Sequence, residues 1–428
     1  MKKLLVLAVG AALLGSASTA FAITDEEGNA SIQFNFSPPG ARSLGMGGAF
    51  LALADDATAA FTNPAGLVQL AAPEISLEVR QTNYDTQFVE AGDFATAPFN
   101  AGGLAYGSTA TDVRNISFLS WVIPMDNWAL AIYRHEFLNF ETDFVSLGPT
   151  ASDSTLFIRP FAAAIEVDTM VNGLSGALKV GDKLSLGVSL NHYEFDINSA
   201  TLRVAITSGG NILGQFTTRQ FGDDGAFGFN LGARYQFNDQ WQFGMVYRRA
   251  PEFGYKASLI SSNGNVSFVK DSTFDAPDVF GIGATWRPME AVTISLDINQ
   301  IFYSDLTDGG VDSNFILDDS ASRPSLDPLK VDDGIEVRLG GEYTFTNFQN
   351  PFSIRAGVWQ DPEHSIRFQG APGTTVDALA NAVLFSIGDD EIHYAGGFGW
   401  AFEKFQLDAA ADFSDLVDTY SVSGVWRF

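Results

Sequence analysis

Histidines and acidic pairs are the side chains of this sequence that could bind a metal ion or transfer a proton. The four histidines lie far apart and lack the spacing of a metal-ligand motif: they are His135, His192, His364 and His393. The acidic pairs could bind calcium, or they could be solvated charge in surface loops. These pairs are Asp223-Asp224, Asp318-Asp319, Asp332-Asp333 and Asp389-Asp390. The histidine spacing predicts no metal site, and no motif predicts a cofactor.

The chain also lacks the patterns that mark common catalytic and nucleotide-binding sites. It has no cysteine, which excludes a thiol nucleophile and a disulfide framework. Gly45-Met46-Gly47-Gly48 does not follow a predicted strand, so a nucleotide site is not expected there. No nucleophile motif supports a serine–histidine dyad, and the net charge of −27 disfavours nucleic acid as a partner. We therefore predict a protein that is not an enzyme and has no catalytic residues.

One stretch, from Gly40 to Leu67, differs from the rest of the chain. Its first part is rich in glycine, and the middle, from Ala49 to Phe61, is small and apolar apart from Asp55 and Asp56. That composition favours about three helical turns. Asn63-Pro64 then ends the helix, because proline lacks an amide donor and disfavours helical backbone at the residue before it. We expect this stretch to form a plug inside a barrel.

The first 22 residues predict a secretory signal peptide. Lys2 and Lys3 give a basic start, Leu4 to Leu14 are mostly apolar, and Ala20-Phe21-Ala22 has the small residues of a cleavage site. The apolar run is too short for a membrane span of about 20 residues. We expect cleavage after Ala22.

Amphipathic strands account for most of the remaining sequence. In the segment 334–345, Val337 and Leu339 fall on one face and Glu336 and Arg338 on the other, as a strand requires. Fourteen such strands are predicted, at residues 75–82, 115–123, 127–137, 171–180, 184–196, 226–237, 241–250, 276–287, 291–302, 334–346, 352–360, 391–402, 404–414 and 418–428.

The connections between these strands alternate between short turns and long polar loops, and aromatic residues recur at strand ends. Both features are typical of outer-membrane barrels, which place apolar residues outside and polar residues inside. We predict an all-β fold: a 14-stranded antiparallel transmembrane β-barrel with an N-terminal plug, or hatch, of short helices in its lumen. Segments 202–206 and 258–269 are expected to extend hairpins into the outer loops. A helix is expected in one outer loop, from Thr374 or Thr375 to Gly388.

The sequence ends in an alternating strand with Tyr420, Val422, Trp426 and Phe428 on one face. This strand is similar to the C-terminal signal read by the outer-membrane assembly machinery. The barrel assembly machinery is therefore an expected partner during biogenesis.

Together, these features resemble the FadL-type outer-membrane transporters, also described as long-chain fatty acid or aromatic hydrocarbon transport proteins. The specific part of the resemblance is the plug, with Ala54-Asp55-Asp56-Ala57 and Asn63-Pro64-Ala65-Gly66. The C-terminal segments LGGEYTF, FSIRAGVWQDPEH and HYAGGFGWAF are also similar to that family in the kinds of residues they contain. The resemblance covers essentially the whole mature chain.

The resemblance implies passive, porin-like uptake of hydrophobic compounds, above all long-chain fatty acids. A hydrophobic small molecule is captured among the outer loops and passes to an internal apolar pocket. Plug movement then opens a route through a lateral gap beside a distorted third strand. Asn63, Pro64, Ala65 and Gly66 are the implied gating residues, although this turn could equally be a purely structural helix stop. The segment Trp128–Phe137, taken as the third strand, has no glycine or proline to mark such a distortion.

Basic residues on the predicted polar faces are candidates to meet a ligand carboxylate. They are Arg80, Arg234, Arg248, Arg338 and Arg355. We expect most of them to be paired with lumenal carboxylates such as Glu78, Glu336 or Glu342, because buried charges need partners.

The expected domains are a signal peptide at residues 1–22, a plug at 23–73 and a transmembrane barrel at 74–428. The expected location is the bacterial outer membrane, where the barrel is a monomer in contact with membrane lipid. A second hypothesis belongs to another class: related plug-bearing barrels serve in protein secretion or surface attachment, and the opening ARSLGMGGAF suits both.

Overall fold

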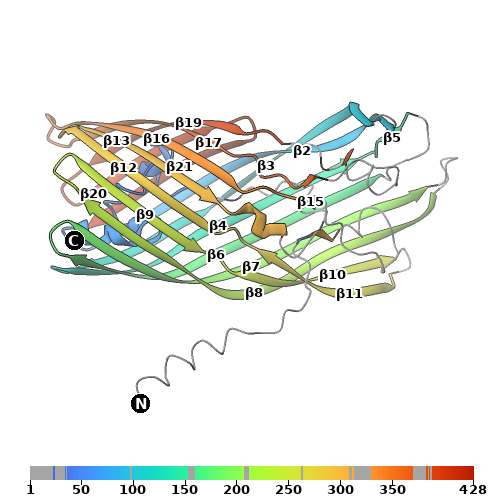
Figure 1. Ribbon diagram of the computed structural model, residues 1–428, viewed down its shortest axis with the longest axis horizontal. Helices are drawn as coiled ribbons and strands as arrows, with labels where there is room; N and C mark the ends of the chain where they lie inside the picture. The colour runs from blue at the N-terminus through green and yellow to red at the C-terminus, as the bar shows by residue number, and fades with distance from the viewer. Residues whose placement is uncertain are drawn as a thin grey trace, which may run out of the picture.

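A closed antiparallel β-barrel dominates the computed structural model (Figure 1). The structure describes residues 23–24, 34, 36–96, 99–152, 160–206, 212–261, 264–307, 311–312, 329–369, 382–383, 385 and 388–428. The strands of the wall are β2 (Glu74–Thr96), β3 (Phe99–Pro124), β4 (Trp128–Ser146), β6 (Phe161–Val180), β7 (Leu184–Ile206), β8 (Ile212–Gln236), β9 (Trp241–Arg249), β12 (Val279–Met289), β13 (Val292–Ile301), β16 (Gly334–Phe345), β17 (Phe352–Asp361), β19 (Glu391–Ala401), β20 (Phe405–Phe413) and β21 (Val417–Arg427).

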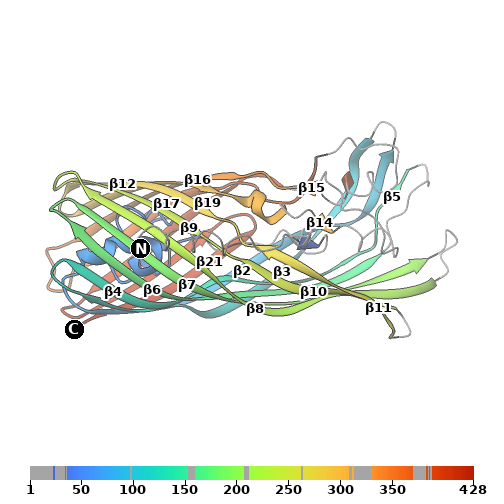
Figure 2. The same ribbon diagram turned by 60° about the horizontal axis from the view of Figure 1, so that its bottom comes forward.

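The seam of the barrel joins its last strand to its first. β21 pairs antiparallel with β2, from Arg427 opposite Glu74 to Val417 opposite Tyr84. Every other wall strand pairs with the next in chain order, so the predicted 14-stranded barrel is confirmed. The short turns lie at the same end as the C-terminus (Figure 1). β2 to β8 run much further toward the other end than predicted, and the β2–β3 hairpin curves away from the β10–β11 hairpin there (Figure 2).

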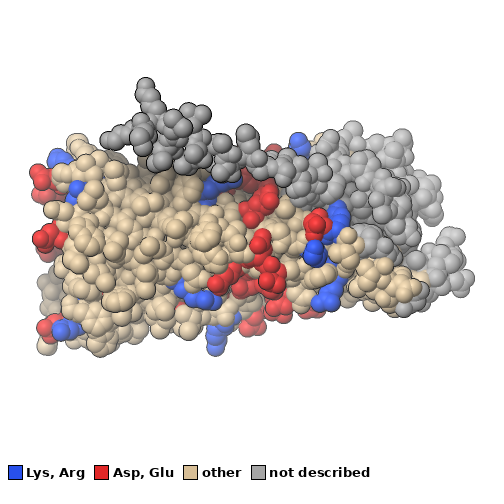
Figure 3. Space-filling view, turned by 90° about the horizontal axis from the view of Figure 1, so that it is seen from below, with Lys and Arg blue, Asp and Glu red and all other residues tan. Residues whose placement is uncertain are grey.

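The two faces of the wall follow the alternation in sequence. Ile335 and Leu339 of β16 are exposed on the outside, whereas Glu336 and Arg338 between them are buried inside. On the face in Figure 3, a nearly uncharged surface lies between the charged residues of the turn end and a belt of charges around the middle. A barrel with this apolar band matches the requirement for contact with lipid. No described helix is long and apolar enough to cross a membrane.

Shorter strands extend the barrel at the end opposite the short turns. The hairpin of β10 (Glu252–Ser261) and β11 (Val266–Asp275) pairs with β8 outside the ring of fourteen. This hairpin and the end of β7 confirm that segments 258–269 and 202–206 extend hairpins. The remaining short elements are β1 (Ile23–Thr24), β5 (Thr150–Ala151), η2 (Tyr303–Thr307), β14 (Val311–Asp312), β15 (Leu329–Lys330) and β18 (Arg367–Phe368). The helix predicted up to Gly388 lies largely outside the described residues.

The plug consists of short helices, but the predicted three-turn helix from Ala49 to Phe61 was wrong. The helical pieces are α3 (Ala41–Leu44), α4 (Ala59–Thr62) and the 3₁₀ helix η1 (Pro64–Gln69). Between α3 and α4 the chain turns sharply: Ala54 has a positive φ of 28°, and Asp56 Oδ1 accepts hydrogen bonds from Thr58. These local bonds to a short acidic side chain compete with helix formation. The end at Asn63 is as predicted, since Asn63 is extended at φ −154°.

Candidate functional site

The barrel wall holds the plug by donating hydrogen bonds to its backbone carbonyls. Ser175 Oγ donates to the Ala60 carbonyl at 2.6 Å, and Asn230 Nδ2 donates to the Phe61 carbonyl at 3.2 Å. Carbonyls at the end of a helix have no partner within it, so these side chains act as caps supplied by the barrel. The further donors are Ser120 to Ala57, Ser185 to Ala65 and Arg248 to Thr62.

The predicted gating turn lies buried against β7 and β8. Asn63 Oδ1 accepts from the Ala65 amide at 3.2 Å, and its Nδ2 donates to the carbonyls of Leu51 and Ala233 at 3.1 and 3.3 Å. One side chain therefore ends α4, begins η1 and fastens both to the wall. Pro64, Ala65 and Gly66 are buried too. The helix-stop role is visible in this geometry, while gating by Asn63, Pro64, Ala65 and Gly66 stays a prediction.

Arg42 makes an ionic contact between plug and wall. Its guanidinium contacts Glu342 of β16 at 3.0 Å and Asp55 of the plug at 2.6 Å. Burial opposes the charge, but Asp55, Glu342 and Asp56 outweigh that effect and hold the pKa of Arg42 above its ordinary value. Burial raises the pKa of Asp56, which Arg42 only partly opposes. Arg287 of β12 reaches Asp55 at 2.9 Å, completing a bridge from two wall strands to one loop of the plug.

Three of the five candidate arginines are paired with the carboxylates expected from sequence. Arg80 contacts Glu78 at 3.0 Å, Arg338 contacts Glu336 at 2.5 Å, and Arg355 contacts Glu342 at 2.6 Å. Arg338 also donates to the Gly47 carbonyl of the plug at 3.0 Å, and Arg355 bridges to Asp408 at 2.7 Å. These three side chains already have anionic partners within the wall, so their role is at least structural.

Arg248 and Arg234 differ from those three in having neutral partners. Among the described residues, neither makes an ion pair with a carboxylate. Arg234 donates to the side-chain oxygens of Gln236 and Gln242. Arg248 is buried, donates to the Thr62 carbonyl at 3.0 Å and lies over the Phe61 ring at 5.0 Å, while its Nε has no hydrogen-bond partner. A buried cation without an anion is costly, which makes Arg248 the arginine best placed to meet a ligand carboxylate.

An aromatic cluster fills the lumen on the loop side of the plug. Phe36, in the segment that leads into the plug, lies edge-on to Phe137 and Tyr303 at centroid distances of 5.8 and 5.9 Å. Phe137 in turn meets Tyr193 edge-on at 5.6 Å. We call this group the aromatic chamber; it comprises Phe34, Phe36, Phe137, Tyr193, Phe195, Phe253, Phe274 and Tyr303. These rings pack against one another in an apolar cluster, so an apolar ligand would enter by displacing a ring such as Phe36.

The wall divides between β3 and β4 on the loop side. β3 pairs with β4 only from Pro124 opposite Ala129 to Phe118 opposite His135. Beyond that point β3 continues with β2, while β4 continues with β6 and has a register shift at Phe137. The third strand is thus distorted by a β-bulge, although its segment Trp128–Phe137 contains neither glycine nor proline.

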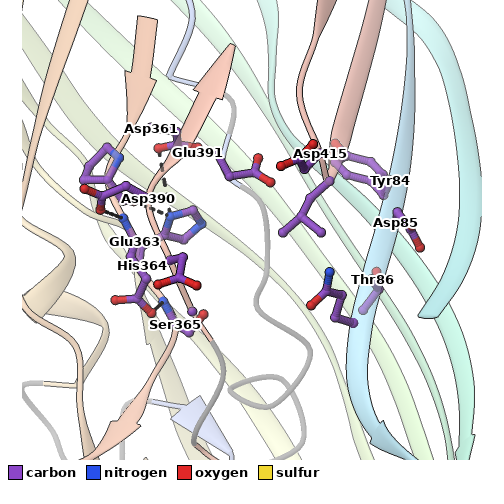
Figure 4. Close-up of a pocket in the computed structure, with 15 residues that line it drawn as sticks. Tyr84, Asp85, Thr86, Asp361, Glu363, His364, Ser365, Asp390, Glu391 and Asp415 are labelled. Carbon is purple, nitrogen blue, oxygen red and sulfur yellow. Dashed lines mark hydrogen bonds and ion pairs between the residues drawn. The ribbon is translucent and has the colours of Figure 1, made fainter. Parts of the chain in front are cut away.

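A cleft of about 220 Å³ near the loop end is acidic (Figure 4). His364 lies in it, with Nδ1 3.0 Å from the Pro362 carbonyl and its ring stacked on Tyr303 at 4.7 Å. The carboxylates that line the cleft are Asp85, Asp361, Glu363, Asp389, Asp390, Glu391 and Asp415. An anion would be repelled here, so a carboxylate ligand must enter elsewhere. Within the described ranges, no group of three or more histidine or acidic side chains could hold a metal ion.

The sequence analysis missed the neutral side chains that hold the plug. Ser175 and Asn230 lie at inward positions of strands whose outward residues are apolar, such as Leu174 and Leu231. An inward polar residue in an apolar strand was therefore the available signal. This signal did not identify the partner as a plug carbonyl, because the segment from Ala49 to Phe61 was expected to be one regular helix with its own hydrogen bonds.

Comparison with known proteins gives a family and a fold. The family model described as outer membrane protein transport protein (OMPP1/FadL/TodX) matches residues 37–415. A FadL homologue from Pseudomonas aeruginosa has a TM-score of 0.65 at 14% identity, covering 96% of this chain and 100% of that one. The toluene transporter TodX of Pseudomonas putida scores 0.58 at 16% identity, covering 92% and 98%. The toluene transporter TbuX of Ralstonia pickettii scores 0.57 at 17% identity, covering 92% and 99%. No curated protein matches.

Proposed function

Because the chain belongs to the OMPP1/FadL/TodX family of outer membrane transport proteins, we propose that it takes up long-chain fatty acids. Members of this family are bacterial outer-membrane channels for hydrophobic compounds, and the family is not one of enzymes. The identity of the substrate is the part that we propose beyond the family, since two of the similar structures are toluene transporters.

The observation that carries the fatty acid proposal is the buried charge of Arg248. A fatty acid anion would supply its missing partner while the alkyl chain lies in the aromatic chamber. Each buried methylene contributes about 0.8 kcal/mol, so transfer from water into the chamber needs no energy source. An aromatic hydrocarbon would gain the apolar contacts but would leave Arg248 as it is.

Passage requires the plug and the N-terminal segment to move. Displacement of Phe36 would vacate the chamber, and a shift of Asn63, Pro64, Ala65 and Gly66 would break the contacts of the plug with β7 and β8. The division between β3 and β4 is the proposed lateral exit into the membrane. We further propose that residues 1–22 are removed as a signal peptide, that 23–73 form the plug and 74–428 the barrel, and that the barrel assembly machinery inserts it as a monomer.

The test is binding of a fluorescent long-chain fatty acid to the refolded mature chain, with oleate and toluene as competitors. We expect saturable binding that oleate displaces. Arg248→Gln should weaken it about tenfold or more, the effect of losing a hydrogen bond to a charged group. Arg248→Lys should retain part of the affinity. Arg234→Gln is the matched control, because Arg234 also has neutral partners, and it should bind as the wild type does.

Other outcomes would move the assignment. Displacement by toluene alone, unaffected by Arg248→Gln, would identify an aromatic hydrocarbon channel. Absence of saturable binding to a correctly folded barrel would favour the alternative, a partner in protein secretion or surface attachment.

A further inference from the structure

A polar row crosses the outer face of the wall at the loop-side edge of its apolar band. Arg134 of β4 stands directly opposite Asn172 of β6, and Asn172 stands opposite His192 of β7. Adjacent strands lie about 4.8 Å apart, so the three side chains project from neighbouring positions on one surface. Exposed apolar residues flank the row: Leu119 is opposite Arg134, and Phe227 is opposite His192.

Arg134 has no close ionic partner in the wall. Its side chain is exposed and, among the described residues, no carboxylate forms an ion pair with it, although its charge acts on Asp168 of β6. Arg249, which also faces outward, is by contrast paired with Asp278 at 2.8 Å. His192 has Glu194 at 4.0 Å, and its ring lies 5.0 Å from the ring of Phe227. Arg134 is therefore an exposed cation where the outward apolar residues Leu130 and Ile132 of β4 end.

An apolar groove of about 690 Å³ adjoins this row on the membrane side. It is lined by Trp121, Ile132, Leu174 and Leu190, which all face outward, and Arg134, Asn172 and His192 stand at its edge. The groove can take a hydrocarbon chain, and its edge offers guanidinium, amide and imidazole donors. A single cation above an apolar groove complements a lipid with an anionic headgroup.

We propose that this groove binds an anionic lipid of the surrounding membrane, with its phosphate on Arg134 and an acyl chain along Trp121 and Leu190. Asn172 and His192 donate further hydrogen bonds to the phosphate oxygens. The site lies on the outer surface, beside the point where β3 and β4 separate, so it is distinct from the lumen but adjoins the proposed lateral exit.

The experiment uses the mature chain reconstituted in phosphatidylcholine bilayers and the fluorescence of Trp121. Brominated phosphatidylglycerol or brominated phosphatidylcholine is added, and quenching of tryptophan fluorescence is measured. The quenching due to Trp121 is the difference between the wild type and Trp121→Phe. We expect quenching by the anionic lipid at a several-fold lower mole fraction, with a preference that weakens at high salt. Arg134→Gln should abolish the preference, and Arg134→Lys should keep most of it. The matched control Arg114→Gln removes an exposed arginine of β3 that does not line the groove, and should change nothing.

Three outcomes would overturn the proposal. The first is equal quenching by the two lipids in the wild type, and the second is a preference that survives in Arg134→Gln. The third is a site that brominated oleate fills in an Arg134-dependent way while phosphatidylglycerol does not, since the groove would then hold fatty acid and not membrane lipid.

Discussion

Arg42 of the plug and Glu342 of the barrel wall are joined by two parallel hydrogen bonds, each 3.0 Å long. The fork of a guanidinium matches a carboxylate in this way, which fixes direction as well as distance. Since Arg42 also holds Asp55, one side chain ties a loop of the plug to β16. A single substitution can therefore remove one of the contacts that hold the plug.

Replacing Arg42 by glutamine should loosen the plug. Loss of one partner leaves Glu342 and Asp55 with less compensation, and the cost of breaking a mostly buried pair is about 3 kcal/mol. We expect faster entry of small sugars into proteoliposomes that contain Arg42→Gln. Arg287→Gln, which removes one more exposed contact to Asp55, should increase entry less. Equal swelling rates for Arg42→Gln and wild type would show that the ion pair does not hold the plug.

Gly232 of β8 should tolerate no side chain while the plug is in place. A Cβ atom there would overlap Asn63 Oδ1 and lie 3.0 Å from Pro64. Gly232→Ala should therefore displace the gating turn and speed the cleavage of plug residues by an added protease. Gly214→Ala on the same strand meets nothing within 4 Å and is the control. A proteolysis pattern shared by the two variants would contradict this account.

The seating of the plug should depend on the protonation of Asp56. Because burial raises the pKa of Asp56, the seated plug binds a proton more tightly than a released plug, where the group titrates near 3.8. Protonation of Asp56 therefore stabilises the seated plug. This stabilisation is complete below pH 3.8 and is lost as the pH rises through the raised pKa of Asp56 in the seated plug. Asp56→Asn should leak less than wild type at neutral pH, and the difference should shrink in acid. A constant difference between them across pH would reject this role for Asp56.

Removing the ring of Phe36 should open the aromatic chamber. Phenylalanine-to-alanine changes in packed sites cost about 3–5 kcal/mol, partly because of the cavity left behind. A cavity lined by Phe137 and Tyr303 is apolar and suits a benzene-sized ligand. We expect Phe36→Ala to bind toluene more tightly than wild type, by isothermal titration. Phe88→Ala, in a separate stacked pair with Phe144 at 4.7 Å, should leave toluene binding unchanged.

The alternation of residues was enough to predict the wall. Val337 and Leu339 against Glu336 and Arg338 determine which face of β16 meets lipid, and the same period repeats around the barrel. The pairing of Arg338 with Glu336 also followed, because a charge inside a closed wall needs a partner nearby. These are local rules, and the sequence contains what they require.

Contacts between distant segments could not be predicted in the same way. The small apolar residues from Ala49 to Phe61 favour a helix only while nothing competes for their backbone. In the structure Asp297 of β13 accepts from the Leu51 amide at 2.8 Å, and Asp56 binds Thr58, so other partners take the place of helical bonds. The bulge at Phe137 depends on the separate paths of β3 and β6, which no pattern within β4 records.

The seam between β2 and β21 has a bearing on the order of folding. Glu74 and Arg427, joined at 2.8 Å, stand 353 positions apart in the chain. The plug precedes β2 in the chain and β21 is the last strand of the ring, so the sheet beside the plug stays open until these two distant strands meet. Strand pairs so distant in sequence form slowly, because a long loop must close before the first hydrogen bond between the two strands can form. Pairing of β2 with β21 completes the ring that surrounds the plug.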